Sequence, residues 1–210
     1  MRFSTVFAPF IALTVTVLGP FAFATMQPLD MQNSGNSLAR MAFDLKDLIA
    51  TINESQNGGA MSDVFDEFDD IFDSVLSNIS LLTGTAVVTD PLDVQLVYEA
   101  YSNFVQGVFE LMDGVADSAP TFIQLDKQNE FRIPAAVREL SGVVDAYLFN
   151  MIGIFPSNSS YAYQSANQKS QVDTHLRRAV HSYHLATART PTPYSNTSAL
   201  PERRRHRLGA

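Results

Sequence analysis

The 210-residue chain contains no cysteine and no tryptophan. Without cysteine it can form neither a disulfide framework nor a thiol nucleophile. Because no disulfide can form, the fold must depend on packing of its apolar side chains, which make up 46% of the residues. Motifs typical of several enzyme classes are also absent, since the sequence has no G-x-S-x-G elbow, no P-loop and no dinucleotide-binding fingerprint.

Basic side chains are scarce over most of the sequence. Residues 30–169 include 20 acidic and 6 basic residues, whereas residues 170–210 include 2 acidic and 7 basic ones. An acidic body repels the phosphate backbone of DNA or RNA, and a short basic tail does not reverse that repulsion. The charge distribution therefore argues against nucleic acid as a partner.

The N-terminus has the pattern of a cleaved signal peptide, predicted over residues 1–24. Arg2 precedes an almost unbroken apolar run from Val6 to Leu18, and Ala22-Phe23-Ala24 fits the small-x-small pattern before a cleavage point. The alternative is a membrane anchor, but the run is too short to span a bilayer comfortably. We therefore expect a secreted protein.

The strongest helical pattern lies between Thr89 and Asp117. Its apolar residues are spaced alternately three and four apart, as on the buried face of a helix. Asp90 is a suitable N-cap and Pro91 suits the first helical position. This segment is predicted to be the central helix of the domain. Its apolar face comprises Val94, Val97, Tyr101, Phe104, Val108, Leu111 and Val115, widened by Val105, Phe109 and Met112.

Four further amphipathic helices are predicted on either side of this segment. Ser62 is expected to cap the second helix of the chain, and Pro134 to open the fourth. A short apolar segment, Thr121–Leu125, is expected to form one helical turn that places Phe122 in the core. In the last helix Ala166 is among the residues expected to face inward. The four helices are predicted over Leu38–Ile52, Ser62–Leu82, Pro134–Met151 and Tyr161–Ala186.

Five helices with short connections, and no alternating strand pattern, predict an all-α antiparallel bundle. We place a linker at residues 25–37, the helical domain at residues 38–186 and a disordered basic tail at residues 187–210. The tail is rich in Pro, Ser, Thr and Arg, a composition that cannot bury enough apolar surface to fold.

Two groups of residues are of the types that bind metals, but each has a simpler explanation than a metal site. The six acidic residues between Asp63 and Asp73 are spaced as a solvated helix face and lack the glycine-containing turn of a calcium loop. His181 and His184 can share a helix face, but a zinc site needs further ligands from elsewhere, and a solvated helix end is the simpler role for them. We expect no metal, cofactor or catalytic residue. A metal-dependent hydrolase that uses the two histidines is the least supported alternative.

Four N-x-S/T sequons are present, and such sites accept glycans in secreted proteins. Asn53, Asn158 and Asn196 lie in predicted loops or in the tail. Asn78 lies on a predicted helix beside its apolar face, which makes it the least favourable of the four positions.

Residues from about Leu38 to Tyr183 resemble the fungal hydrophobic surface-binding protein A family, also called cell-wall galactomannoproteins. The similarity lies in the order of the segments, a signal peptide followed by cysteine-free amphipathic helices. Locally it rests on Val115–Phe122 and on Val137–Met151 with the following Phe155-Pro156. In both the family and this chain a helix ends, a proline precedes an aromatic residue, and a long helix leads to another proline.

The resemblance implies a non-catalytic protein of the extracellular space or the cell wall. Such a protein would bind hydrophobic surfaces, or hold lipids such as fatty acids inside the helical bundle. Cell-wall polysaccharide or a secreted hydrolase would be further partners. The alternative is a structural, glycosylated wall mannoprotein without a ligand.

Bulky and flexible apolar side chains on the predicted helices suit an apolar channel for an acyl chain. Side chains of this kind at helical spacing are also typical of a filled core, and both interpretations stay open at this point. The candidate channel residues are Phe65, Phe68, Phe72, Phe104, Val108, Phe109, Met112, Phe122, Leu140, Tyr147 and Met151.

Overall fold

The computed structural model describes residues 25–189, and all regular secondary structure in that range is helical. The predicted signal peptide and residues 190–210 of the predicted tail lie outside the described residues. Between residues 25 and 189, no helix combines the length and hydropathy that crossing a bilayer requires. The elements are α1 (Pro28–Ser55), the 3₁₀ helix η1 (Gly58–Ala60), α2 (Met61–Leu82), α3 (Pro91–Asp117), α4 (Ala119–Leu125), α5 (Asn129–Gly153) and α6 (Ser160–Arg189).

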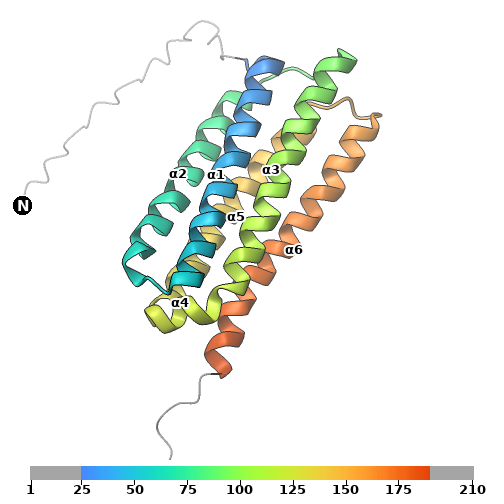
Figure 1. Ribbon diagram of the computed structural model, residues 1–210. Coiled ribbons are helices and arrows are strands. Elements are labelled where there is room, and N and C mark those ends of the chain that lie inside the picture. Colours follow the sequence, from blue (N-terminus) through green and yellow to red (C-terminus); the bar gives the residue numbers. More distant parts are fainter. Residues whose placement is uncertain (1–24, 190–210) are drawn as a thin grey trace, which may run out of the picture.

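The five long helices lie side by side in two layers (Figure 1). Consecutive long helices run in opposite directions, so α1, α3 and α6 run the same way and form the front layer in that order. Behind them, α2 packs against α1 and α5, and α5 also packs against α6. The short α4 covers the end of the bundle next to α5 and α6. This arrangement confirms the predicted all-α antiparallel bundle.

Apolar side chains from every long helix meet in one core that also contains three buried tyrosines. Burial raises the pKa of the Tyr101, Tyr147 and Tyr183 phenols, because the ionised form would lose its hydration. The hydroxyl of Tyr101 donates to the backbone oxygen of Ser165 at 2.8 Å. The hydroxyl of Tyr183 has no hydrogen-bond partner among the described residues. Both tyrosines are therefore buried, but of these two hydroxyls the one on Tyr101 has a hydrogen-bond partner among the described residues and the one on Tyr183 does not.

The first helix starts earlier than the sequence indicates. α1 begins at Pro28, so the predicted linker over residues 25–37 is wrong for most of its length. Met31 and Gly35 are buried and extend the apolar face by two turns. Glycine and polar residues in this segment indicated a loop, but Gly35 lies in close contact with Ala100 of α3. Tertiary packing therefore overrides the local composition.

Two other helix starts also differ from the prediction. The N-cap position of α2 is Ala60, and Ser62 donates to the adjacent aspartate instead of capping the helix. α5 begins at Asn129, which places Pro134 inside the helix. Asn129 fixes this earlier start because its Nδ2 donates to the backbone oxygen of Phe122 at 3.0 Å. A proline this close to a helix N-terminus removes only one backbone hydrogen bond.

The remaining elements follow the prediction closely. Asp90 caps α3, since its carboxylate accepts from the next two available backbone N–H groups at 2.9 and 3.1 Å. The short α4 places Phe122 in the core with 0% exposure. α6 continues three residues past the predicted end. Within it Ala166 is exposed, contrary to prediction, and the neighbouring Ser165 is buried.

Candidate functional site

The structure places the predicted channel residues in and around the interior of the bundle. Three of the eleven are only partly buried, namely Phe65 and Phe72 on α2 and Phe109 on α3. The other eight are buried on four different helices. They are Phe68, Phe104, Val108, Met112, Phe122, Leu140, Tyr147 and Met151.

These buried side chains pack against one another. Phe104 and Tyr147 contact edge to face, with ring centroids 5.5 Å apart. Beside Phe68, Phe72 and Leu140, a crevice at the α2–α5 surface has a volume of about 10 Å³, which is about the space of one water-sized probe. That crevice is too small to admit an acyl chain. The internal channel therefore stays a prediction.

A much larger hollow lies on the surface between α5 and α6, and we call it the α5–α6 groove. Its volume is about 480 Å³, within the range of small-molecule pockets. Val137, Leu176 and Val180 form an apolar floor, and Ser141 completes it. The polar rim consists of Arg138 from α5 and of Asp173, Arg177, His181 and His184 from α6.

Helical periodicity explains how α6 supplies most of this rim. Asp173, Arg177, His181 and His184 follow one another at intervals of four, four and three residues, which places them along one face. From Asp173 to His184 the groove follows α6 for about 16 Å at the helical rise per residue. Sequence reasoning treated the two histidines as a solvated helix end. The recurrence of cationic residues beside Leu176 was the signal that could have indicated a groove.

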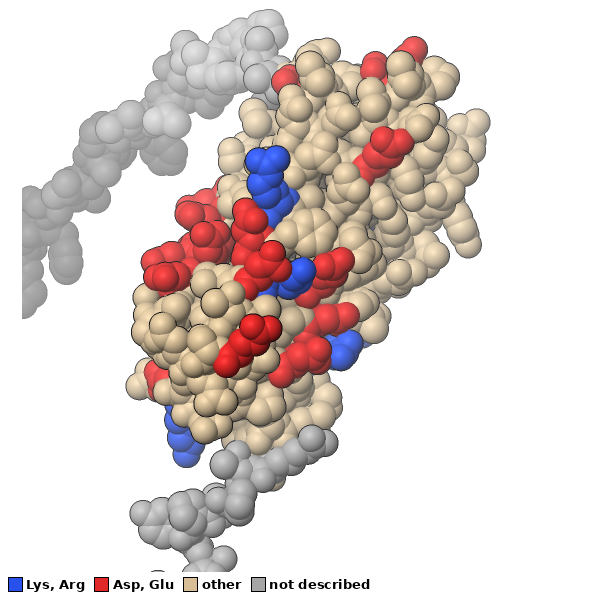
Figure 2. All heavy atoms as spheres, viewed as in Figure 1, with Lys and Arg blue, Asp and Glu red and all other residues tan. Residues whose placement is uncertain are grey.

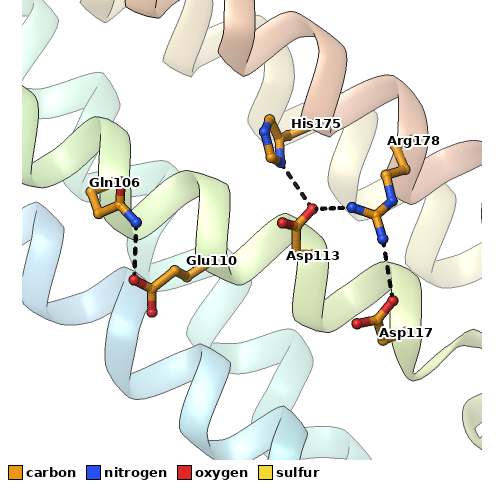
Figure 3. A network of polar contacts seen from close by, with 6 residues as sticks. All are labelled: Gln106, Glu110, Asp113, Asp117, His175 and Arg178. Atoms are coloured by element: carbon orange, nitrogen blue, oxygen red, sulfur yellow. Dashed lines mark hydrogen bonds and ion pairs between the residues drawn. The ribbon is translucent and has the colours of Figure 1, made fainter.

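The opposite side of α6 carries cations that are paired with carboxylates. Asp113 of α3 contacts Nδ1 of His175 and a terminal nitrogen of Arg178, each at 2.9 Å (Figure 3). Arg178 also reaches Asp117 at 3.5 Å. The ring of His175 stacks on Phe109, with centroids 4.5 Å apart. Charges on this side thus connect α6 to α3.

The cations of the groove are not paired in this way. Among residues 25–189, none of the charged groups of Arg138, Arg177, His181 and His184 forms an ion pair with a carboxylate. The Nε of Arg177 donates to the backbone oxygen of Asp173 at 3.0 Å. That bond fixes the side chain and leaves its terminal nitrogens without a protein acceptor among the described residues.

Acidic side chains outnumber basic ones over the described chain as a whole. Figure 2 shows more acidic than basic side chains on the face of the molecule viewed there. At physiological ionic strength, salt screens exposed charges beyond about 8 Å. An anionic group inside the α5–α6 groove would therefore interact mainly with the cationic rim and only weakly with the acidic body.

The other sites considered from the sequence are placed as follows. Within residues 25–189, no three His, Asp or Glu side chains gather in the arrangement of a metal site. Asn158 is exposed in the turn before α6, whereas Asn53 lies in α1 and not in a loop. Asn78 donates to a backbone oxygen of its own helix at 2.8 Å and accepts from Ser34. Asn196 lies outside the described residues, and glycosylation of all four stays a prediction.

The fold places the described part of the chain in the class of all-α helical bundles, here with five long helices. No family model matches the sequence, and no curated protein matches it either. A solved structure with a similar fold is ligand-binding domain 1 of the Penicillium marneffei MP1 protein, complexed with arachidonic acids. The match has a TM-score of 0.65 and 9% sequence identity, and it covers 75% of this chain and 99% of that one. At this identity the likeness shows the shared fold alone, and membership of the hydrophobic surface-binding family stays a prediction.

Proposed function

We propose that this chain is a secreted, non-catalytic protein that binds lipids with an acyl chain. The observation that carries the proposal is the α5–α6 groove, a hollow of about 480 Å³ with an apolar floor. Burial of apolar surface contributes about 25 cal/mol per Å², which favours transfer of an acyl chain from water to such a floor. The fold adds support, since the similar MP1 domain was solved with arachidonic acids.

The other parts of the proposal come from the sequence. The extracellular or cell-wall location follows from the predicted signal peptide. The non-catalytic role follows from the lack of a recognisable catalytic motif. The alternative is the structural, glycosylated wall protein, in which the helices pack without any ligand.

Native mass spectrometry of the secreted protein, analysed without delipidation, tests this function first. We expect a discrete added mass that disappears on organic extraction and returns when palmitate is added. Peptide and glycan masses alone, with no uptake of added palmitate, would contradict lipid binding and favour the structural wall protein.

Three variants then locate the bound chain. Ser141→Phe places a ring in the α5–α6 groove and should reduce palmitate uptake at least tenfold. Ala166→Phe adds the same ring at an exposed position of α6 that does not line the groove, and should leave uptake unchanged. If the chain instead enters the core, Ser141→Phe will have no effect and Phe104→Leu will change uptake.

A second function, adsorption to hydrophobic surfaces, is favoured by a different observation. Four large apolar side chains are exposed at one end of the bundle, where α1 and α3 begin and α2 ends (Figure 1). Apolar groups gathered in this way are typical of interaction surfaces. They are Leu29 at 64%, Leu81 at 40%, Val87 at 49% and Leu92 at 63% exposure.

Adsorption to alkyl-coated beads tests this second function. The double variant Leu29→Gln, Leu92→Gln should adsorb several-fold less than the unmodified protein. Phe131→Gln with Leu185→Gln is the matched control, because these exposed apolar residues lie at the opposite end of the bundle. Equal losses in both variants would indicate nonspecific adsorption and contradict a dedicated surface.

A further inference from the structure

We infer that the α5–α6 groove selects amphiphiles with an anionic head, a carboxylate bound between Arg138 and Arg177. The inference rests on the proposed function and deepens it, because that function requires only an acyl chain. Two arginines and two histidines line the groove, against the single carboxylate of Asp173. The excess of positive charge is local, in a body that is otherwise acidic.

The two arginines lie on opposite walls of the groove. Arg138 belongs to α5 and Arg177 to α6, and both are exposed at the rim. A head group between them would receive charge-assisted hydrogen bonds from both sides, and guanidinium groups match the geometry of a carboxylate. Leu176 and Val180 lie below the rim and would receive the acyl chain. The groove thus provides separate sites for the two ends of one amphiphile.

Comparison of the two sides of α6 argues against a purely structural role for the rim. Where α6 faces α3, Asp113 contacts both His175 and Arg178. Where α6 faces the groove, the partner of Arg177 among residues 25–189 is the backbone oxygen of Asp173. Arg138 and Arg177 bring two like charges to the rim of one groove. A bound anion would neutralise both, which an apolar ligand cannot do.

Arg138 and Arg177 are the groups that carry the proposed selectivity, because a guanidinium group stays charged throughout the physiological pH range and can hold a carboxylate with two hydrogen bonds.

The experiment measures the affinity of the full secreted chain for dodecanoate, dodecanol and acetate by calorimetry at pH 7.5. The first two probes share their chain length and differ only in the charge of the head. Acetate carries the same carboxylate without the chain. We expect dodecanoate to bind at least tenfold more tightly than dodecanol, with acetate weaker than both.

Variants connect this preference to the groove. Arg138→Gln with Arg177→Gln should lower dodecanoate affinity by about tenfold for each charge-assisted hydrogen bond lost, and should lower dodecanol affinity by much less, so that the preference for dodecanoate disappears. Arg40→Gln with Lys127→Gln removes the same charge from exposed positions outside the groove. This control should keep the preference, and matching circular dichroism spectra would show that all variants are folded.

The other outcomes overturn the inference in distinguishable ways. Equal affinity of the unmodified chain for dodecanoate and dodecanol would refute the anionic head while lipid binding stands. A preference that survives in the arginine variant would place the head group elsewhere. Acetate binding as tightly as dodecanoate would indicate a site for small anions. Failure of both long-chain probes to bind would refute the proposed function itself.

Discussion

Gly107 of α3 lies so close to Ala39 of α1 that a Cβ on the glycine would be 3.1 Å from the carbonyl oxygen of Ala39. The same atom would lie 3.1 Å from the Cβ of Ala42. One to two turns closer to the start of the two helices, a Cβ on Gly35 would lie 3.1 Å from that of Ala100. Small residues therefore bring the α1 and α3 backbones together along a shared interface.

A matched pair of glycine variants tests this close approach. Gly142 lies inside α5, and a Cβ added to it would meet no atom within 4 Å, so Gly142→Ala should gain only helix propensity. We expect its free energy of unfolding to rise by about 0.5–1 kcal/mol. Gly107→Ala gains the same propensity but pushes against backbone, and should lower the free energy of unfolding by about 1 kcal/mol. Urea unfolding measures the free energy of unfolding of both variants. Changes of the same sign and size would contradict the tight contact between α1 and α3.

The buried tyrosines provide a second matched pair. Tyr101→Phe removes the hydrogen bond to the backbone of Ser165 and should cost about 1 kcal/mol of stability. Tyr183→Phe removes a buried hydroxyl that has no partner among the described residues, so stability should stay equal or increase. Chemical denaturation measures the free energy of unfolding of both variants. A larger loss at Tyr183 than at Tyr101 would show that its hydroxyl is hydrogen-bonded in solution.

Alkaline solution should destabilise the protein through the same residues. The folded state raises the pKa of Tyr101, Tyr147 and Tyr183 above the usual value of 10.0. Above pH 10 the unfolded chain loses phenol protons that the folded chain retains, so stability falls as the pH rises. Three such groups give a loss of up to about 3 kcal/mol between pH 10 and 11.

Urea midpoints between pH 8 and 11 measure this loss. Tyr183→Phe should remove about a third of the slope if the three groups contribute equally. An unchanged slope in that variant would mean that the Tyr183 phenol ionises freely in the folded protein.

The polar network between α3 and α6 should contribute modestly and in a salt-dependent way. Asp113 contacts both His175 and Arg178, so Asp113→Asn should lower stability by about 1 kcal/mol at low salt and by less in 1 M NaCl. Asp117→Asn is the control, because Asp117 is 73% exposed and reaches Arg178 only at 3.5 Å. Thermal unfolding at two salt concentrations compares them. Equal effects of the two variants would show that Asp113 is not the centre of the network.

Periodicity and capping residues were sufficient to predict most of the fold. The interval pattern of α3 and the cap at Asp90 describe that helix almost to the residue. The proline and Phe122 after it likewise predicted α4. The start of α1 was missed because Gly35 is unfavourable in an isolated helix and becomes favourable only when α3 packs against it.

The α5–α6 groove could not be predicted from the sequence in the same way. Its floor and rim come from two helices, and the rotation of one helix relative to the other is set by the packing of the whole bundle. The residue types themselves can be read from the sequence, since Leu176 and Val180 are apolar and His181 is polar. The sequence did not indicate that Arg138 would lie across from Arg177.

The glycine and alanine contacts between α1 and α3 also determine which parts of the molecule can open. At these contacts the two helices touch through backbone and methyl groups, so no side chain lies there whose rotation could widen the space between them. Local opening that admits a ligand should therefore involve α5 and α6, which frame the groove. In hydrogen exchange, amides of α1 and α3 should exchange most slowly, at rates that report global unfolding, while those of α6 should exchange through smaller fluctuations.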